Sequence, residues 1–598
     1  MKEAVADRLQ LSENARRVLN VRYLRRNALG QVIETPDQLF ARVAKAVSES
    51  ESLYGPAGEA RLWEERYYEM LASLDFLPNS PTLMNAGMRL GQLSACFVLP
   101  IEDSMESIFG TLRDAALIQR TGGGTGFSFS HLRPTGDFVS STGGTSSGPL
   151  SFMRIYDCVT ENIKQGGRRR GANMAVLRCD HPDIEEFINA KRDGASLKNF
   201  NISVGATDAF MEAASSNGML QLRHPSDDRV VGSRRAQELF SAICESAWET
   251  GDPGLLFLDT IERANPTPEA GRIESTNPCG EVPLLAYESC NLGSINLSHF
   301  VNGVEGEATI DWERLAGTVR AATRFLDDVI SANKFSLPAI QEATLANRKI
   351  GLGVMGFAEM CILLGVPYSS DAALEVASNV MRFIASEACA ASQLLAEQRG
   401  VFPNWDQSTF GKRRLRVRNA TKTSIAPTGT ISIIAGTSSS IEPLFALAYR
   451  RRSVLDEQPL TELNSIFLKY LERYRLDSRE VLESVLVSGN LGQQSRVPKR
   501  LRDLFRTALE VTPEQHIRIQ AAFQKHVDNA VSKTVNLPES ATPDDIARVY
   551  MLAHELKCKG VTVFRYGSKS DQVLTLGVDE ESYEREHFAK CDPGACRL

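Results

Sequence analysis

Asn277-Pro278-Cys279-Gly280-Glu281 is the stretch that decides how this chain is interpreted, because it sets a thiol between a carboxamide and a carboxylate. In an extended segment alternate side chains point the same way, so Asn277, Cys279 and Glu281 would face one spot. A nearby negative charge raises the pKa of a thiol, whereas a nucleophilic thiolate needs a positive neighbour. The trio therefore suits a cysteine that reacts as something other than a thiolate, for instance as a radical.

The composition is that of a large globular protein. The chain has 598 residues, of which 42% are hydrophobic and 24% are charged, enough for a substantial core and more than one domain. The formal charge of -7 is spread over both signs without a basic block. This argues against a nucleic acid polymer as a partner and leaves local phosphate sites open.

Features of the sequence also bear on the compartment. The opening MKEAVADRLQ carries charges where a secretory signal has an apolar run, so we expect neither export nor a membrane anchor. The 11 cysteines are too sparse for a disulfide scaffold, and an odd number cannot all pair, which predicts a reducing, cytoplasmic location. No histidine lies in a CxxC or HxxxH pattern, so no protein metal site is predicted.

The chain divides into three predicted parts. Residues 1–75 form an N-terminal helical region, with apolar residues at helical spacing. Residues 76–570 alternate short β segments, Gly-rich loops and helices, which favours an α/β barrel or a doubly wound sheet. Within this part, residues 450–513 are more polar and are expected to form an inserted or peripheral helical region. Residues 571–598 are expected to be a flexible C-terminal tail.

Four further cysteines suggest a dithiol relay. Cys96 and Cys290 lie in short apolar or polar motifs, and each could equally be a buried core cysteine. Cys591 and Cys596 form a C-x4-C pair on a polar tail that contains Gly and Pro. Exposed thiols are a liability, so accidental cysteines are a weaker explanation there. A mobile tail could reduce an internal disulfide again after each reaction.

Two small-residue segments could bind phosphate. Residues 426–432, APTGTIS, bring hydroxyls and backbone N–H groups to the start of a predicted helix, although an ordinary capped turn explains this pattern equally well. Residues 121–126, TGGGTG, let a backbone approach a ligand closely. They lack the Gly-Lys-Ser/Thr ending of an ATP-binding P-loop and the βαβ setting of a dinucleotide fingerprint, so they indicate neither.

Together these motifs resemble the catalytic chain of the ribonucleotide reductases, most closely the adenosylcobalamin-dependent class II. The resemblance covers most of the chain, in order through residues 76–82, 94–96, 122–127, 277–281, 290–294, 427–442, 526–534 and the cysteine tail. It implies a ten-stranded α/β barrel with Cys279 at the tip of a central finger loop, together with the N-terminal helical region. It also implies a homodimer.

The resemblance assigns the radical chemistry to the opening trio. Cys279 would be the thiyl radical that abstracts the ribose 3′ hydrogen, Glu281 would take the 3′-hydroxyl proton, and Asn277 would hydrogen-bond the substrate. The substrate, a ribonucleoside diphosphate, would lie against Ser80, Ala95, Cys96, Gly124, Asn277, Pro278, Cys279, Gly280, Glu281, Pro427, Thr428, Gly429, Thr430 and Ile431.

The resemblance also assigns the dithiol chemistry. Cys96 and Cys290 would protonate the departing 2′-hydroxyl and supply two electrons, ending as a disulfide. Cys591 and Cys596 would then reduce this disulfide, and thioredoxin or a similar protein would be the external reductant.

The radical source is inferred from absences in the sequence. Class I chains carry a pair of adjacent tyrosines near the C-terminus, whereas the matching stretch here reads Val561-Thr562-Val563-Phe564-Arg565-Tyr566. No glycyl-radical motif or zinc-binding cysteine cluster of class III is present at the end of the sequence. Adenosylcobalamin remains as the cofactor. The alternatives are a class I subunit with a separate radical-generating metalloprotein, and a nucleotide-binding regulator that has lost catalysis.

The family also binds a deoxynucleoside triphosphate effector at a dimer interface. Asp103, Ser104 and Arg133 match that effector site by position, and residues 192–199 match the loop that relays the identity of the effector to the substrate. A solvated loop with ordinary charge pairs is the alternative. The N-terminal region is too short for the full nucleotide-binding cone that switches overall activity in many relatives.

Overall fold

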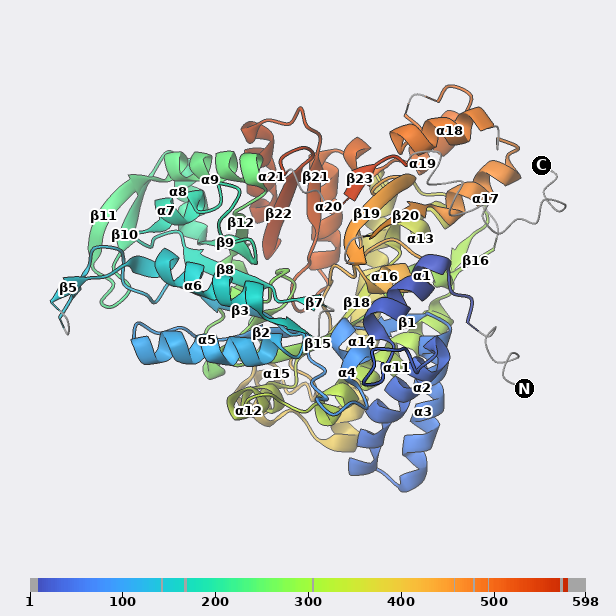
Figure 1. Ribbon diagram of the computed structural model, residues 1–598, viewed down its shortest axis with the longest axis horizontal. Helices are drawn as coiled ribbons and strands as arrows, with labels where there is room; N and C mark the ends of the chain where they lie inside the picture. The colour runs from blue at the N-terminus through green and yellow to red at the C-terminus, as the bar shows by residue number, and fades with distance from the viewer. Residues whose placement is uncertain are drawn as a thin grey trace.

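The computed structural model describes residues 9–140, 143–165, 169–303, 306–455, 458–476, 479–492, 494–569 and 574–578. A ten-stranded sheet forms the centre of the molecule, helices lie around it, and an all-helical region packs at one side (Figure 1).

The N-terminal part is helical. Its elements are α1 (Glu13–Val18), η1 (Leu19–Tyr23), α2 (Pro36–Ser48), η2 (Glu49–Leu53) and α3 (Ala57–Ala72). Thr35 and Gln38 start α2 with a capping box, in which each side chain accepts a hydrogen bond from the backbone N–H of the other. Leu39, Val43 and Val47 then recur at helical spacing and are buried. The helices α2 and α3 pack side by side at the lower right of Figure 1.

Five parallel strands form the first half of the barrel. They are β2 (Cys96–Val98), β3 (Gly124–Ser128), β8 (Asn173–Arg178), β9 (Phe200–Ala206) and β12 (Gly254–Phe257), each paired with the next. The connections contain α5 (Met105–Gln119), α6 (Gly148–Asn162), α7 (Ile184–Asn189), α8 (Asp208–Ser215) and α9 (Ala236–Thr250). Parallel neighbours need such crossovers, which explains the alternation of strands and helices in the sequence.

The second half is built from β15 (Ser289–Asn296), β18 (Ile350–Met355), residues 423–425, β21 (Thr534–Leu537) and β22 (Gly560–Arg565). β15 and β18 are parallel, as are β21 and β22. Parallel bridges from Leu352 to Thr423 and from Ile425 to Val531 link these two pairs of strands. The antiparallel pairs β2–β15 and β12–β22 join the two halves and close the barrel. The helices of this half are α11 (Trp312–Ala332), α12 (Pro338–Asn347), α13 (Phe357–Leu363), α14 (Asp371–Arg399), α16 (Ile431–Ala435), α20 (Pro513–Gln524) and α21 (Pro543–Glu555).

A short hairpin lies within the barrel. Its strands β13 (Ser275–Thr276) and β14 (Pro283–Leu284) pair antiparallel, and β13 contacts β2, β3 and β8. The segment between the two strands carries Cys279. With residues 423–425 counted as a strand, each half of the barrel has five strands, and β1 is a further strand paired with β15. The predicted ten-stranded α/β barrel with a central finger loop is thus confirmed.

Residues 450–513 differ from the prediction. The region begins with the hairpin β19 (Ala448–Leu455) and β20 (Gln458–Leu463), to which β23 (Leu574–Leu576) adds a third strand. The helices α17 (Ser465–Arg473), α18 (Arg479–Ser488) and α19 (Lys499–Leu504) follow. Charged residues concealed the strand pattern because Arg451 has internal partners: it donates to the Gly429 carbonyl and lies 3.4 Å from Glu462.

The remaining elements are short. The strand β1 (Phe76–Pro78) pairs with β15 and leads into α4 (Ser80–Asn85). The small hairpins are β4–β5, β6–β7, β10–β11 and β16–β17. Their strands are Phe138–Val139, Gly144–Thr145, Lys164–Gln165, Arg169–Arg170, Met219–Arg223, Val230–Arg235, Val301–Asn302 and Thr309–Ile310. The other helical pieces are α10 (Leu258–Arg263), α15 (Thr409–Lys412), η3 (Pro268–Ala270), η4 (Leu297–Phe300), η5 (Pro403–Gln407) and η6 (Ala508–Glu510).

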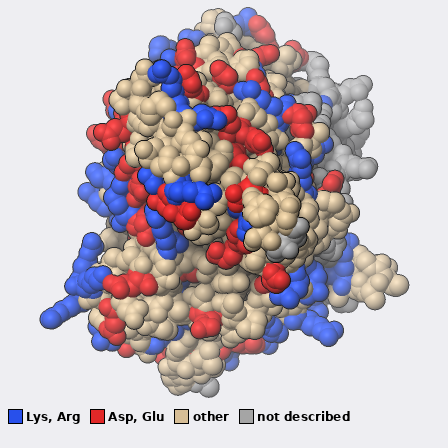
Figure 2. Space-filling model, turned by 90° about the vertical axis from the view of Figure 1, so that its left-hand side faces the viewer, with Lys and Arg blue, Asp and Glu red and all other residues tan. Residues whose placement is uncertain are grey.

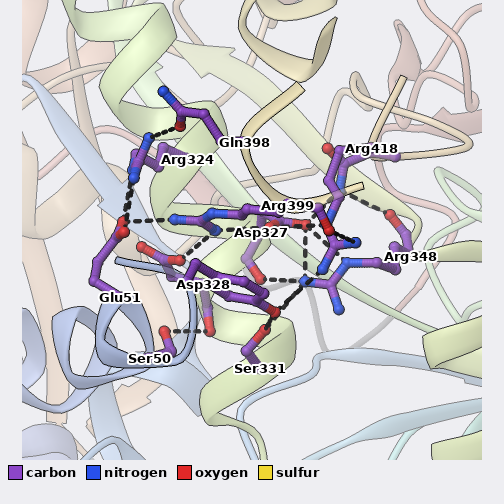
Figure 3. A network of polar contacts seen from close by, with 12 residues as sticks. Ser50, Glu51, Arg324, Asp327, Asp328, Ser331, Arg348, Gln398, Arg399 and Arg418 are labelled. Carbon is purple, nitrogen blue, oxygen red and sulfur yellow. Dashed lines mark hydrogen bonds and ion pairs between the residues drawn. The ribbon is translucent and has the colours of Figure 1, made fainter. Parts of the chain in front are cut away.

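A buried ion network joins the N-terminal helices to α11 and α14 (Figure 3). The Arg399 guanidinium reaches Glu51 Oε1 at 2.7 Å, Asp328 Oδ1 at 2.7 Å and Asp327 Oδ2 at 2.9 Å. All four side chains are 0% exposed. Arg324 binds the same Glu51 carboxylate at 2.6 Å. Glu51 comes from η2 and the aspartates from α11, so the network holds elements together that are far apart in the sequence.

The molecular surface is mixed in charge. On the face shown in Figure 2, acidic and basic side chains are interspersed rather than gathered in a single-sign patch. Among the described residues, no helix has the length and apolar character needed to cross a membrane. Within the same described ranges, no group of three or more His, Cys, Asp or Glu side chains could hold a metal ion.

Candidate active site

The finger loop presents Cys279 through a tight turn. The Gly280 N–H donates to the Asn277 carbonyl at 3.0 Å, and Gly280 has φ +81°, a left-handed conformation that favours glycine. The Val282 N–H donates to Asn277 Oδ1 at 3.0 Å. The expectation of an extended segment was therefore wrong. Asn277, Cys279 and Glu281 nevertheless line one cavity, because the turn brings them together.

Glycines of β3 make room for the finger loop. A Cβ at Gly126 would lie 1.7 Å from the Thr276 carbonyl oxygen, and a Cβ at Gly124 would lie 2.8 Å from Cγ of Pro278. On the other side, the Glu281 carbonyl accepts hydrogen bonds from a backbone N–H and a serine hydroxyl, both at 2.9 Å. The TGGGTG motif thus serves, at Gly124 and Gly126, the close approach of two protein segments.

A cavity of about 240 Å³ opens beside Cys279. Nearly all the residues predicted to contact the substrate line it. They are Ser80, Ala95, Cys96, Gly124, Asn277, Pro278, Cys279, Glu281, Pro427, Thr428, Gly429, Thr430 and Ile431. Gly280 is the exception, and it lines a second cavity instead.

Residues 427–431 form a fixed loop at the start of α16. Thr428 has φ +52°, and its hydroxyl accepts the Ser440 N–H at 2.7 Å. Arg451 Nη1 donates to the Gly429 carbonyl at 2.7 Å. These contacts orient the loop so that its small residues face the cavity. The first N–H groups of a helix have no partner within the helix and suit an anion.

Two residues of the N-terminal region were not anticipated at this site. Arg22 and Tyr23 in η1 also line the 240 Å³ cavity, and the Tyr23 hydroxyl lies 2.7 Å from Ser80 Oγ. The guanidinium adds positive charge to a cavity that also holds residues 427–431. A single arginine in a polar helical stretch carries no sequence signal of this role.

Cys96 and Cys290 lie opposite each other across the β2–β15 seam. Their Cα atoms are direct partners in the antiparallel register, and both side chains belong to one apolar cluster with Val98, Val282 and Leu292. Both are buried thiols. Burial raises the pKa of Cys290 well above its usual range, so this sulfur stays protonated. Directly opposed residues in a sheet meet the spacing that a disulfide needs.

A second cavity, of about 470 Å³, lies on the other side of the finger tip. It shares Pro278, Cys279 and Pro427 with the first cavity. Much of its wall is apolar and comes from Met174, Leu255, Leu256, Val531, Val561 and Val563. A third cavity, of about 620 Å³, shares Phe445, Thr534, Asn536 and Leu574 with the second. Cys279 thus lies between a cavity that holds the candidate phosphate loop and a larger apolar space.

The predicted effector residues are close together at the start of α5. Arg133 Nε lies 2.7 Å from Asp103 Oδ2, and Ser104 caps α5 by accepting the Ser107 N–H at 3.1 Å. Residues 192–199 form the connection from α7 to β9, and Arg192 pairs with Glu249 at 3.1 Å. These contacts are those of a folded loop with ordinary ion pairs, so the effector role stays a prediction. Cys591 and Cys596 lie outside the described residues.

The fold and the site together define a class of enzyme: a ten-stranded α/β barrel in which a cysteine-bearing finger loop adjoins a cross-strand pair of thiols. A family model described as the barrel domain of ribonucleotide reductase matches residues 94–564, and one described as its all-alpha domain matches residues 9–91. The chain belongs to the ribonucleotide reductase family. This confirms the resemblance found in the sequence motifs.

Individual relatives support this family membership. A protein of Thermoplasma acidophilum described as a vitamin B12-dependent ribonucleoside-diphosphate reductase is 49% identical, over 97% of this chain and 82% of the relative. A protein of Mycobacterium tuberculosis with the same description is 51% identical, over 96% and 82%. A solved structure, the alpha subunit of the Actinobacillus ureae class Id ribonucleotide reductase, has a TM-score of 0.75 over 93% of this chain and 97% of that one. At 24% identity, this last likeness is one of fold alone.

Proposed function

We propose that this chain reduces ribonucleoside diphosphates to 2′-deoxyribonucleotides through a thiyl radical on Cys279, generated with adenosylcobalamin. The observation that carries the proposal is the position of Cys279, which lines both the 240 Å³ cavity and the 470 Å³ cavity. One sulfur can therefore meet a radical source on one side and a substrate on the other. The family membership and the B12-dependent relatives support the same reaction.

The larger space is the proposed cobalamin site. The 470 Å³ cavity has apolar walls from β9, β12 and β22, and it shares Phe445 with the 620 Å³ cavity, so a group larger than either cavity would have room to extend. Met174, Leu255, Val561 and Phe445 would hold it by apolar contact. When bound, adenosylcobalamin supplies a radical by homolysis of its cobalt–carbon bond.

The substrate would be held by its phosphates and its ribose. Residues 427–431 and Arg22 would bind the diphosphate through N–H groups and positive charge. Asn277 would hydrogen-bond the ribose, and Glu281, buried at 3% exposure, would accept the 3′-hydroxyl proton as Cys279 takes the 3′ hydrogen. The same hydrogen returns to C3′ at the end, which regenerates the radical on Cys279.

The thiol pair would supply the reducing power. Cys96 and Cys290 together give two hydrogens, as two electrons and two protons. The C2′–O bond breaks and the 2′-hydroxyl leaves as water. A C2′–H bond forms, and a sulfur–sulfur bond joins the two cysteines. The register of β2 and β15 supports this pairing. Cys591 and Cys596 would exchange with that disulfide and in turn be reduced by thioredoxin or a similar protein.

The proposal also covers partners and compartment. A deoxynucleoside triphosphate would bind near Asp103, Ser104 and Arg133 in a homodimer, and residues 192–199 would relay its identity. Thiols that must be re-reduced in every cycle suit the cytoplasm. Neither alternative is favoured: relatives at 49% and 51% identity are described as B12-dependent rather than as class I subunits, and a regulator without catalysis would not need the opposed thiols.

An anaerobic assay tests the proposal. The purified chain is expected to reduce CDP or ADP with dithiothreitol when adenosylcobalamin is added, and not without it, because the barrel supplies the thiols but not the radical source. Product is measured as deoxynucleotide by chromatography. Turnover that requires a second metalloprotein and ignores the corrinoid would contradict the proposal.

Gly126→Ala should cut turnover about 100-fold, the scale on which a displacement near 1 Å acts on catalysis. The added methyl group would lie 1.7 Å from the Thr276 carbonyl oxygen, so the finger loop must shift. Gly317→Ala is the matched control, because Gly317 lies in α11 with nothing within 4 Å of an added Cβ. The control should keep full turnover and gain up to about 1 kcal/mol in stability. Equal turnover of the two variants would show that the close approach is unimportant.

A further inference from the structure

Asn201 contacts the finger loop next to the radical cysteine. Its Nδ2 donates to the Pro278 carbonyl oxygen at 2.8 Å. Asn201 is the exposed member of the otherwise buried strand β9, and its neighbours in the wall of the 470 Å³ cavity include Ile202 and Ser203. A polar side chain there is not required for packing. The acceptor belongs to the peptide group that joins Pro278 to Cys279.

This contact restrains the one torsion of Pro278 that is left free. The pyrrolidine ring fixes φ of Pro278, and the ring itself lies against Gly124, where an added Cβ would be 2.8 Å from Cγ. The ψ torsion decides where the carbonyl points and therefore where the following residue, Cys279, is placed. A donor on the carbonyl holds that torsion, so Asn201 orients the peptide that carries the sulfur.

Asn201 is itself held on both sides. Lys191 Nζ donates to the carbonyl of Phe200, the preceding residue, at 2.6 Å. The N–H of Ile202, the following residue, donates to Asp252 Oδ1 at 3.5 Å. Lys191 and Asp252 are paired at 2.9 Å, with side chains only 12% and 9% exposed. These two side chains, called the clamp below, therefore fix the backbone of β9 on either side of Asn201 through a largely buried ion pair.

We infer that Asn201 is a positioning residue for Cys279, and that the Lys191–Asp252 pair sets its place. The inference rests on the proposed function, because it concerns the alignment of Cys279 with the substrate. Lys191 immediately precedes residues 192–199, so a shift of that loop acts on β9 and through Asn201 on the finger tip. Residues 192–199 and Cys279 are thereby linked through Lys191, Phe200 and Asn201.

Asn201→Asp tests the contact with little change of shape. The carboxylate cannot donate to the Pro278 carbonyl and repels it, so kcat at saturating adenosylcobalamin should fall about 10- to 100-fold while the substrate KM changes less than twofold. Asn201→Gln, which keeps a donor on a longer arm, should recover part of kcat. Asn189→Asp is the matched control, since its Nδ2 also donates to a backbone carbonyl, that of Glu185 at 2.7 Å, but on the exposed surface of α7.

A double-mutant cycle tests the clamp. Lys191→Met should also lower kcat, and Lys191→Met with Asn201→Ala should be no slower than Asn201→Ala alone, because both act through one contact. Multiplied losses would overturn the link between Lys191 and Asn201. A wild-type kcat in Asn201→Asp would overturn the positioning role. So would losses of kcat and of melting temperature that are as large in Asn189→Asp as in Asn201→Asp. Failure of the wild-type chain to reduce nucleotides would instead refute the proposed function.

Discussion

Cys279→Ser is expected to abolish deoxynucleotide formation and to leave nucleotide binding intact. The hydroxyl is nearly the size of the thiol, so the turn held by Gly280 and Asn277 should persist. An O–H bond is much stronger than an S–H bond, so serine cannot take over as the radical that abstracts hydrogen. The loss should be on the order of 10⁴-fold or more, the scale seen when the reacting group itself is removed.

The measurement is anaerobic reduction of CDP or ADP with adenosylcobalamin and dithiothreitol, with nucleotide binding followed by equilibrium dialysis. Cys158→Ser is a suitable control because Cys158 is also an exposed thiol, on α6 and away from the three cavities. It should keep wild-type turnover. Deoxynucleotide produced by the Cys279→Ser chain would exclude a sulfur radical at this position.

Arg399→Met is expected to lower the free energy of unfolding by about 3–5 kcal/mol, the usual cost of leaving a buried charge without its partner. The substitution keeps most of the volume but leaves Glu51, Asp327 and Asp328 facing one another at 0% exposure. Burial alone would raise the pKa of Asp327, but the charges of Arg348, Arg418 and Arg399 hold it below its usual range. Figure 3 shows the guanidinium between these carboxylates.

Urea unfolding followed by circular dichroism measures the effect. Arg61→Met is the control, because Arg61 pairs with Glu65 at 3.5 Å on an exposed helix face and should change stability by less than about 0.5 kcal/mol. If Arg399→Met does not fold, the double variant with Asp328→Asn should restore folding in part, because Asp328 loses its ion pair with Arg399, whereas Glu51 keeps Arg324 and Asp327 keeps Arg348. Equal urea midpoints of unfolding for Arg399→Met and Arg61→Met would show that the network does not contribute to stability.

The barrel itself could be predicted only through the family resemblance. Alternating strands and helices are compatible with an open sheet as well as a closed one. Closure depends on single bridges such as Ile425 to Val531, which no periodicity reveals. The hairpin β19–β20 was missed for a different reason. Arg451 makes internal contacts, so a strand looked like a charged helical surface.

The site shows the same division between local and distant information. Asn277, Cys279 and Glu281 could be singled out because they are neighbours in the sequence, although their geometry was misjudged: a turn, not strand alternation, brings them together. Arg22 and Asn201 could not be found, since each reaches the site from an element far away in the chain. The buried ion network around Arg399 could not be predicted from the composition either, because charged residues are expected on the surface.

The opposed cysteines of β2 and β15 have a consequence for the chain as a polymer. Cys96 and Cys290 are roughly two hundred residues apart in sequence. In loop-closure models, a disulfide between such distant residues lowers the entropy of the unfolded chain and raises the free energy of unfolding by about 5 kcal/mol. No strand has to shift its register for this disulfide to form, because the two residues are already paired opposite each other. The proposed catalytic cycle would therefore add and remove a covalent brace at every turnover, and resistance to heat would rise and fall with the oxidation state.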